Sequence, residues 1–447
     1  MIYKYTSTRL SLLLSIAVSV FISSCSTELT EPKYSDGDAD FAKYIAIGGG
    51  YSSGYGDHAL HLRNQQHSYP AILAERFSKA SGGEFIQPLV NAGVGLGLDS
   101  NAMSILQISN SICGDPFITP VPADSIGDLS NATWIGAVIR YQNMSVPGAM
   151  IADLNKQQFG DPSPFVGNVF YSRFAINPGQ STVIGDALVQ SPTFYTLWAG
   201  MEDVYSFAVG GGFQSNDSIT TVLDFEASLN TITSSFFAIS TQGAIATIPT
   251  PDNIPYFSVI PWNGLELSES EAQALTQAYA GINPNMVFQE GNNGFVITDN
   301  AEPSGIRQLF SGELVLANIS IDSINCSGYG ATVPFPSRLI LDQQELGLIN
   351  NAINGYNNAI RSTASNNSLA LVEMQPVFEN IAQGFTFNGA TYSNGQIYNS
   401  VYSSDGLYPN PRGNALIANA FISAINRKFG AKLPFADINS FPSNNIP

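Results

Sequence analysis

Residues 42–50 read AKYIAIGGG, an apolar run from Ala42 to Ile47 that stops at three consecutive glycines. Such a run predicts a buried strand that ends in a tight turn. Further predicted strands lie at 136–141, 193–198, 243–248 and 369–372. Apolar residues at helical spacing predict helices at 67–78, 228–240, 341–364 and 415–429. Strands that alternate with helices are typical of an α/β protein whose parallel sheet is covered by helices on both faces.

Two segments interrupt this alternation, at 82–131 and at 249–336. Both are rich in turn residues and carry only isolated apolar runs, which predicts loops rather than further strands of the sheet. We expect the two segments to be insertions over the carboxyl ends of the strands, where they would shape a cleft. Together with these insertions, residues 41–447 are expected to form a single domain.

The N-terminus has the layout of a secretory signal. Lys4 and Arg9 are the only charged residues before Cys25, and the apolar run at 10–22 is too short to cross a membrane comfortably. The tripeptide Ile-Ser-Ser stands directly before Cys25 and resembles the lipobox of bacterial lipoproteins. That resemblance implies that residues 1–24 are a signal peptide and that Cys25 carries a lipid.

A lipid on Cys25 would make a bacterial membrane the first partner of this chain. It would place the protein in the cell envelope as an outer-membrane lipoprotein, on the periplasmic or the surface face. The polar stretch 25–40 is then expected to be a flexible tether. The alternative is an ordinary signal peptide in which a cysteine stands by chance.

The charge balance excludes other partners. Without residues 1–24 the chain has 15 Lys and Arg against 35 Asp and Glu, a net charge of −20, which disfavours nucleic acid and anionic lipid surfaces. The hydrophobic fraction of 44% is ample for a large core. Charged residues make up only 12% of the chain, against a usual fraction of about 25%, so that Asn, Ser, Gly and Gln supply most of the polarity.

Two cysteines remain besides Cys25, namely Cys113 and Cys326. In an oxidising compartment they would pair and close a very long loop, and otherwise they would be two inert buried thiols. The chain has no CxxC pair and no zinc-like spacing. We expect no cofactor.

Four short segments follow predicted strands or precede the last helix. They are IGGGYSSGY at 47–55, NMSVPGA at 143–149, WAGMED at 198–203 and DGLYP at 405–409. Their order, with SYPAIL at 68–73 and PRGNALIAN at 411–419, resembles the blocks of the SGNH (GDSL-type) hydrolase family, in particular its long, lipid-anchored bacterial members. The resemblance implies a flavodoxin-like three-layer α/β/α fold and, in active members, ester hydrolysis through an acyl-enzyme.

The resemblance also shows which family positions are degenerate in this chain. Gly50 stands where the family has its nucleophilic serine, and Tyr408 stands where it has the histidine base. Glu202 replaces the asparagine that donates to the oxyanion, and a carboxylate there would repel that oxyanion unless it were protonated. The backbone donor Gly148 and the carboxylate Asp405 are retained. Three replacements at once predict the loss of serine hydrolysis.

Two other kinds of enzyme stay open at this point. Ser52 or Ser53 would have to take over the role of the nucleophile for a residual esterase. Displacement by two or three residues disfavours this, because a misplacement of about 1 Å already costs around a hundredfold in rate. His58, His61 and His67 would have to gather around a metal ion for a metal-assisted hydrolase, although no HExxH-like pattern supports such a site.

An acidic cluster is the last candidate for chemistry. Glu202, Asp203 and Asp405 would suit glycosidic chemistry at defined separations, but we favour the interpretation that the two aspartates brace the loops at the strand ends.

The favoured hypothesis is a non-catalytic protein that binds a glycan or another neutral, hydroxyl-rich ligand in the cleft where active SGNH hydrolases have their active site. Tyr51, Tyr55, Trp198 and Tyr408 would supply flat contact surface, although Trp198, on a buried strand, is better explained as core. Glu202 and Asp405 would accept hydrogen bonds from the hydroxyls of the ligand. The expected pocket residues are Gly50, Tyr51, Ser52, Ser53, Gly148, Glu202, Asp203, Asp405 and Tyr408. The alternative is a structural component of a surface complex of proteins, in which the insertions make the contacts.

Overall fold

The computed structural model describes residues 33–93, 95–97, 107–109, 117–119, 129–136, 140–163, 166–319, 321–393 and 400–444. The chain from Ser35 onward forms one compact unit. The predicted signal peptide, Cys25 and Cys113 lie outside the described residues. Within the described ranges, no helix is both long enough and apolar enough to cross a membrane.

The last residues of the expected tether pack against the domain instead of being free. The Asp38 amide donates to the Phe429 carbonyl at 2.8 Å, and the Lys432 amide donates to the Ser35 carbonyl at 2.8 Å. Ala39 is buried. The tether prediction is therefore corrected for residues 35–40, because their backbone groups have found partners in the fold.

The centre of the fold is a parallel sheet in the order β1-β7-β8-β15. Its strands are β1 (Tyr44–Gly48), β7 (Phe194–Trp198), β8 (Gln242–Ala246) and β15 (Ala370–Val372). Each adjacent pair runs parallel, with Gly48 opposite Trp198 at the carboxyl end. Ile45, Ala46 and Ile47 have no exposed surface, as expected for a strand covered on both faces.

The strand predicted at 136–141 is not formed at its described residues 136, 140 and 141. Residues 137–139 of it lie outside the described residues, and the segment that pairs with β1 comes later, at 142–146. There the Ala46 amide donates to the Gln142 carbonyl, and the Val146 amide to the Gly48 carbonyl, both at 2.9 Å. With this edge segment counted, the spatial order of the strands is 2-1-3-4-5, which is the order of flavodoxin-like folds.

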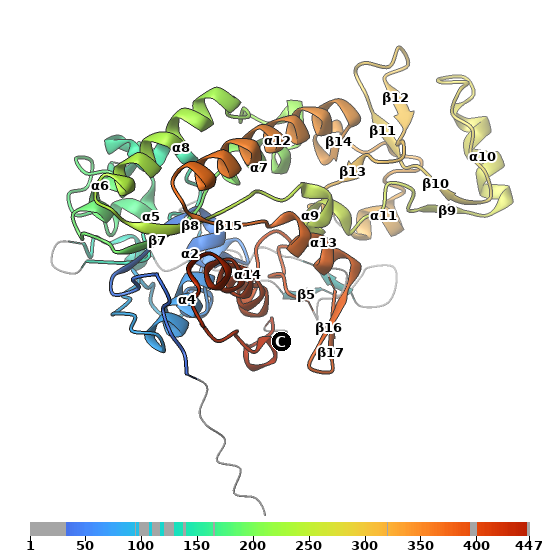
Figure 1. The fold of residues 1–447 in the computed structure, drawn as a ribbon. Helices are drawn as coiled ribbons and strands as arrows, with labels where there is room; N and C mark the ends of the chain where they lie inside the picture. The colour runs from blue at the N-terminus through green and yellow to red at the C-terminus, as the bar shows by residue number, and fades with distance from the viewer. Residues whose placement is uncertain are drawn as a thin grey trace, which may run out of the picture. The chain divides into compact units, whose positions relative to one another are not determined.

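Helices cover both faces of the sheet, as Figure 1 shows. On one face lie α4 (Tyr69–Ser78) and α14 (Pro411–Phe429), where the rings of Tyr69 and Phe421 stack at 4.7 Å. On the other lie α8 (Val222–Phe237) and α12 (Gln343–Asn366), where Phe225 and Tyr356 stack at 4.1 Å. The predicted three-layer α/β/α fold with a parallel sheet is confirmed.

Shorter elements connect these layers. The helices are α2 (Gly50–Ser53), α3 (Leu62–Gln66), α5 (Val169–Ser172), α6 (Val183–Leu188), α7 (Glu202–Val209) and α13 (Gln375–Gln383). The strands are β2 (Tyr55–Gly56), β3 (Ala59–Leu60), β4 (Leu96–Gly97), β5 (Gln107–Ser109), β6 (Phe117–Thr119), β14 (Ile340–Leu341), β16 (Phe385–Phe387) and β17 (Ala390–Tyr392). Of these, β2 and β3 form an antiparallel hairpin that matters for the site below.

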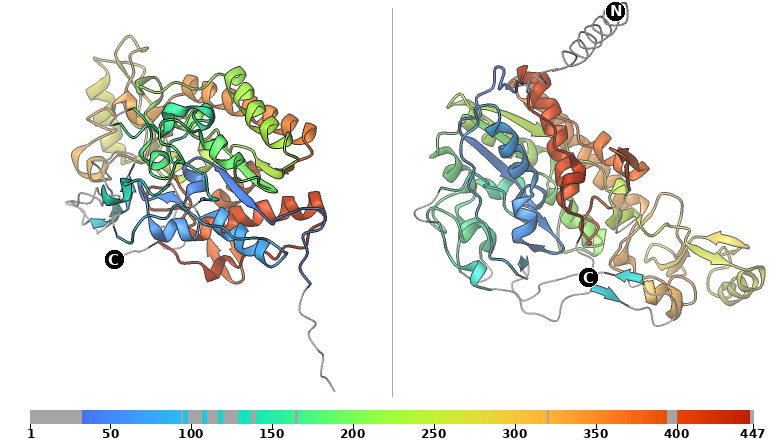
Figure 2. Two further views of the ribbon diagram at one scale, coloured as in Figure 1. Left: turned by 90° about the vertical axis from the view of Figure 1, so that its left-hand side faces the viewer. Right: turned by 90° about the horizontal axis from the view of Figure 1, so that it is seen from below.

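The segment 249–336 forms short hairpins and helices with two small apolar clusters of its own. Its elements are α9 (Pro255–Ser258), β9 (Leu265–Leu267), α10 (Glu269–Tyr279), β10 (Gly291–Asn293), β11 (Val296–Thr298), β12 (Ile306–Gln308), β13 (Leu314–Val315) and α11 (Ile321–Ser327). Figures 1 and 2 show most of it, in yellow, to one side of the sheet. Buried Arg307 pairs with Glu313 at 2.7 Å within it.

Cys326 lies in α11 and is disulfide-bonded. Because Cys113 lies outside the described residues, the pairing of these two cysteines stays a prediction.

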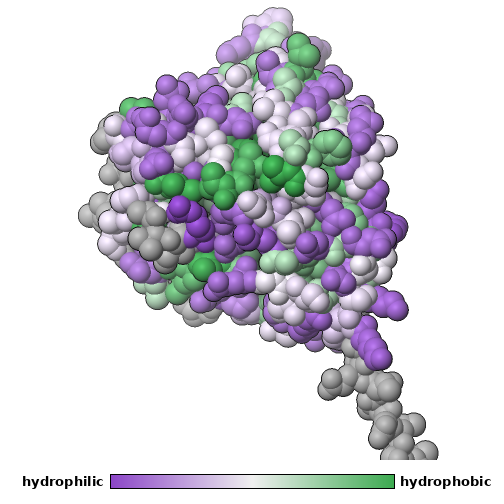
Figure 3. All heavy atoms as spheres, turned by 60° about the vertical axis from the view of Figure 1, so that its left-hand side comes forward, coloured by the Kyte–Doolittle hydropathy of each residue, from purple (hydrophilic) through white to green (hydrophobic). Residues whose placement is uncertain are grey.

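The surface mixes apolar and polar residues. Figure 3 shows one face on which hydrophobic residues form a band between hydrophilic ones. In the described chain, large apolar side chains such as Leu223 and Phe237 are exposed, at 75% and 64%. Such a surface agrees with the low charged fraction of 12%.

Candidate functional site

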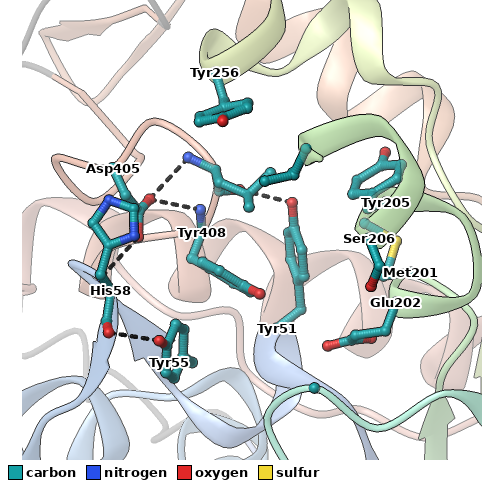
Figure 4. A pocket seen from close by; sticks show the side chains of 13 residues that line it. Tyr51, Tyr55, His58, Met201, Glu202, Tyr205, Ser206, Tyr256, Asp405 and Tyr408 are labelled. Atoms are coloured by element: carbon teal, nitrogen blue, oxygen red, sulfur yellow. Dashed lines mark hydrogen bonds between the residues drawn. The ribbon is translucent and has the colours of Figure 1, made fainter. Parts of the chain in front are cut away.

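A pocket of about 210 Å³ lies where β1 and β7 end, at the carboxyl edge of the sheet. In a parallel sheet of this order, that is the point where ligands are usually bound. Figure 4 shows the side chains that line it. They are Tyr51, Tyr55, His58, Gly148, Met201, Glu202, Tyr205, Ser206, Val209, Tyr256, Asp405, Leu407 and Tyr408.

Gly50 was expected to line the pocket but does not, because the ring of Tyr408 occupies the space in front of it. A Cβ atom placed on Gly50 would lie 2.5 Å from Cε1 of Tyr408, closer than carbon atoms approach in proteins. The same ring packs against Tyr51 and Tyr55, with both centroid separations at 5.0 Å. Burial raises the pKa of Tyr408 well above its ordinary value of 10, and the nearby Glu202 carboxyl adds to this. The Tyr408 hydroxyl therefore stays protonated at any physiological pH.

The carboxyl group of Glu202 lies against the backbone before α2. The Gly50 amide donates to Oε1 of Glu202 at 2.7 Å. A Cβ atom on Gly49 would lie 2.2 Å from both carboxyl oxygens, so any larger residue there would displace this carboxyl group. Glu202 is only 7% exposed, and its Oε2 has no hydrogen-bond partner among the described residues. Burial raises the pKa of Glu202 to about 7, and the charge of Asp203 adds to this. The backbone groups of Gly50, of Glu202 itself and of Gly148 oppose the shift.

Asp405 lines the pocket but holds its own loop together. Its Oδ1 accepts hydrogen bonds from the Ser403 hydroxyl at 2.6 Å, the Leu407 amide at 2.8 Å and the Tyr408 amide at 3.0 Å. Its Oδ2 accepts from the His58 amide at 3.3 Å. With these four donors, Asp405 orients the backbone of Tyr408 and has the bracing role expected from the sequence.

The β2–β3 hairpin closes one side of the pocket. Its two turn residues, Asp57 and His58, both have a positive φ, at 56° and 58°, as the tightest hairpin turns require. Non-glycine residues adopt this conformation at a cost of about 1–2 kcal/mol each. The hairpin is held by hydrogen bonds from the Ser404 amide to Asp57 Oδ1 at 2.8 Å and from the Tyr55 hydroxyl to the His58 carbonyl at 2.5 Å.

The two serines after Gly50 face away from the pocket. The Ser52 hydroxyl is fully buried and lies 3.0 Å from the Tyr69 hydroxyl, on the side of α2 that faces α4. The Ser53 hydroxyl donates to the Gly50 carbonyl at 3.0 Å. Their expected place in the pocket is therefore corrected: the helical turn of α2 directs both hydroxyls into the protein.

Asp203 and Trp198 also lie outside the pocket. Oδ2 of Asp203 accepts from the Ile151 amide at 2.8 Å, and the residue is 1% exposed. Asp203 was expected among the pocket residues, but it follows Glu202 on α7 and points to a different side of that helix. Trp198 is buried, and its indole NH donates to the Thr247 carbonyl at 3.1 Å, as expected of a core residue.

The three histidines have different environments. His58 lines the pocket, whereas the Nδ1–H group of His67 donates to the Arg63 carbonyl at 2.8 Å and its ring packs edge-on against Phe441. Burial lowers the pKa of His61, with Asp57 opposing the shift. Among the described residues, no group of three or more His, Cys, Asp or Glu side chains is arranged to hold a metal ion.

Several pocket residues were not found from the sequence. Met201 directly precedes α7, and Tyr205, Ser206 and Val209 follow Glu202 on that helix. Tyr256 comes from the segment 249–336. The positions three, four and seven after Glu202 share its helix face, so the helical period was a usable signal for those on α7. No comparable signal marks Tyr256.

The contact between Gly50 and Tyr408 makes a prediction about stability. Gly50→Ala should lower the free energy of unfolding by about 2 kcal/mol, because the new methyl group overpacks against the Tyr408 ring. In a Tyr408→Ala background the same change should cost nothing, or stabilise, because alanine is the better helix residue. Urea denaturation of the four proteins measures this coupling.

Gly347 in α12 serves as the control, because no atom lies within 4 Å of its Cβ position. Gly347→Ala should stabilise by about 0.5–1 kcal/mol. Equal costs of Gly50→Ala in both backgrounds would show that the ring does not fill the space at residue 50.

Comparisons with known proteins match this chain only to solved structures. No protein-family model matches this chain, and no curated protein sequence matches it. One similar solved structure is LAE5, an alpha/beta hydrolase enzyme from the metagenome of Lake Arreo, Spain, at 13% identity over 87% of this chain and 96% of that chain, with a TM-score of 0.35.

Two others have a TM-score of 0.36 and 10% identity. One is Axe2, an acetylxylan esterase from Geobacillus stearothermophilus, matched over 87% of this chain and 95% of that chain. The other is a protein described as a GDSL-like lipase from Parabacteroides merdae, matched over 88% of this chain and 99% of that chain. At these identities and scores, we rest nothing about the site on the similarity.

Proposed function

We propose that this chain is a lipid-anchored protein of the bacterial envelope, related to SGNH hydrolases, that binds a small neutral, hydroxyl-rich ligand in its pocket without hydrolysing it. One observation carries the proposal: the Tyr408 ring fills the space that a side chain at residue 50 would need, and the Glu202 carboxyl group accepts the hydrogen bond of the Gly50 amide. The place of the nucleophile and the place of the oxyanion are both filled by the protein's own groups.

Serine hydrolysis needs a nucleophile, a base and fixed donors for the oxyanion. In the resemblance to SGNH hydrolases, residue 50 would supply the nucleophile and residue 408 the base. Glycine has no hydroxyl, and a tyrosine whose pKa is raised by burial is no base at neutral pH. The Gly50 amide, which would donate to an oxyanion, already donates to Glu202. The Ser52 and Ser53 hydroxyls do not reach the pocket.

The lining of the pocket supports binding of an uncharged ligand. Five of its thirteen residues are tyrosines, and none of the lining residues is a lysine or an arginine. Aromatic rings offer flat, partly apolar contact to the faces of sugar rings. At about 210 Å³ the pocket is smaller than most sites for drug-sized ligands, which run from about 300 Å³. It suits one sugar unit or one substituent of a longer chain.

Two measurements on the same purified protein test the proposal. Wild-type protein should not hydrolyse a short-chain chromogenic ester faster than a triple variant with Ser52→Ala, Ser53→Ala and Ser206→Ala. This variant removes the serine hydroxyls of α2 and of the pocket. In ligand-observed NMR, neutral mono- and disaccharides should bind, and Tyr256→Ala should weaken that binding by about fivefold through lost ring contact. Phe435→Ala, at an exposed ring outside the pocket, is the matched control. Serine-dependent turnover, or equal binding by both variants, would overturn the proposal.

A further inference from the structure

We propose that Glu202 binds the ligand as a hydrogen-bond donor through Oε2, and that the group it holds is an uncharged amide carbonyl, as in an N-acyl substituent. This inference rests on the proposed function, since it names the chemical group that enters the same pocket. It reverses the role expected from the sequence, in which Glu202 would act as an acceptor for ligand hydroxyls.

The hydrogen bonds of Glu202 decide which of its oxygens can carry a proton. Oε1 accepts from the Gly50 amide at 2.7 Å and is therefore occupied as an acceptor. Oε2 has no hydrogen-bond partner among the described residues, although it is buried and belongs to a side chain that lines the pocket. A proton on the carboxyl group thus resides on Oε2. A buried polar atom left unpaired is costly, so a ligand that pairs with it gains binding energy.

The surroundings of Glu202 favour the protonated form. Burial raises the pKa of the carboxyl to about 7. Asp203 on the same helix and Asp405 across the pocket are both acidic, and burial raises the pKa of Asp203 to about 6. The remaining titratable groups of the pocket are His58 and the tyrosines Tyr51, Tyr55, Tyr205, Tyr256 and Tyr408. No lysine or arginine among the lining residues offsets a negative charge on Glu202.

A second donor faces the same cavity. The Tyr408 hydroxyl has no hydrogen-bond partner among the described residues, and Figure 4 shows it directed into the pocket. By contrast, the hydroxyls of Tyr51 and Tyr205 already donate to the carbonyls of Leu407 and Pro249, both at 2.7 Å. The pocket therefore offers O–H donors from Glu202 and Tyr408, which call for an acceptor in the ligand.

An amide carbonyl is the acceptor that matches this pair best. Its oxygen has two lone pairs and carries no charge, so it meets both donors without repulsion from Asp405. A carboxylate would be repelled by the acidic groups, and a hydroxyl brings a proton of its own that would need a further acceptor. Met201, Val209 and Leu407 supply an apolar wall for the alkyl part of an acyl group. The small volume of the pocket suits a group of this size.

Matched pairs of small probes test the inference by ligand-observed NMR. Each pair compares an acetamido compound with its hydroxyl counterpart, such as N-acetylglucosamine with glucose and acetanilide with phenol. The acetamido members should bind more tightly, and about tenfold more tightly at pH 6 than at pH 8, because the competent protonated form falls from about nine-tenths to about one-tenth of the protein across that range.

Variants at Glu202 and His58 separate the donor role from other causes. In Glu202→Gln the amide oxygen can keep the hydrogen bond from Gly50, and the NH2 group then stands in the place of Oε2 as a permanent donor. This variant should bind the acetamido probes equally at both pH values, whereas Glu202→Ala should bind them about tenfold more weakly than wild type at pH 6. His58→Asn suits the positive φ of this turn residue and should keep the pH dependence.

The outcomes also distinguish this inference from the proposed function. Hydroxyl probes that bind as well as acetamido probes, or loss of the pH dependence in His58→Asn, would overturn the donor role of Glu202 and leave ligand binding in the pocket intact. Absence of binding by every probe at both pH values would overturn both.

Discussion

A triple variant with Gly50→Ser, Tyr408→His and Glu202→Asn should hydrolyse a short-chain chromogenic ester at least about 100-fold faster than the wild-type chain. The estimate is modest, because a general base and one oxyanion donor each contribute about 10²-fold or more in working enzymes. The three changes restore the hydroxyl, the base and the side-chain donor that the resemblance to SGNH hydrolases assigns to these positions.

The structure explains why the three changes must be made together. A serine at residue 50 needs the space that the Tyr408 ring now fills, with a Cβ-to-Cε1 separation of only 2.5 Å. Histidine is smaller and would stand on a backbone already oriented by Asp405, whose Oδ1 accepts from the amide of residue 408 at 3.0 Å. Replacing the Glu202 carboxyl with an amide removes the negative charge beside the Gly50 amide, so that this amide can serve an oxyanion.

The matched control keeps the two supporting changes and places alanine at residue 50. It differs from the test protein by a single hydroxyl, so any excess in turnover belongs to a serine nucleophile. Equal rates for the two proteins would mean that the loops around the pocket have also changed beyond the reach of these three side chains.

Glu202→Gln should stabilise the protein increasingly as the pH rises, by about 3 kcal/mol more at pH 8 than at pH 4. The pKa of Glu202 is raised from 4.5 to about 7 in the folded protein, and one pKa unit corresponds to about 1.4 kcal/mol. The folded state therefore binds more protons than the unfolded state between these two values, and wild-type stability falls as the pH rises through that window. Below about pH 4 the carboxyl is protonated in both states and costs nothing.

Urea denaturation of wild type and variant between pH 4 and pH 8 measures this difference. Asp203, whose pKa is also raised, is present in both proteins, so the cost of its own burial cancels and only its repulsion of Glu202 enters the measured difference. Glu226→Gln, at an exposed position of α8, is the matched control and should show no such trend. A constant difference between wild type and Glu202→Gln over this range would mean that Glu202 is ionised in the folded protein as readily as in the unfolded chain.

Much of the fold could be predicted from local patterns. The strand predicted at 42–47 corresponds to β1, because a continuous apolar run before a glycine turn is a local signal. The strand predicted at 136–141 does not pair with β1 at its described residues. The mixed polar segment 142–146 pairs with β1 at the sheet edge instead, and its polar residues hid it from an apolar pattern. The helix predicted from residue 228 starts at Val222, where the Thr221 side chain caps it. Leu223 in its first turn is 75% exposed, which hid the start from an apolar pattern.

The candidate site was predicted in part. Glu202, Asp405 and Tyr408 follow from the order of the short blocks, and the structure places all three around one pocket. Ser52 and Ser53 stand in the same block, yet α2 turns their hydroxyls into the core, which depends on the packing of Tyr69 beside them. Tyr256 enters the pocket from a segment whose path no local pattern describes.

By itself, the sequence predicted a parallel α/β fold, and its resemblance to SGNH hydrolases predicted glycine, glutamate and tyrosine at three positions where hydrolysis would need other side chains. Only the tertiary structure decided that these residues form one connected site. Gly50 and Glu202 are 152 residues apart in the chain, so neither spacing nor period can bring the amide of one to the carboxyl of the other. That contact, and the position of the Tyr408 ring over Gly50, depend on how β1, β7 and the loop before α14 pack together. Only this packing brings groups that are far apart in the chain into direct contact.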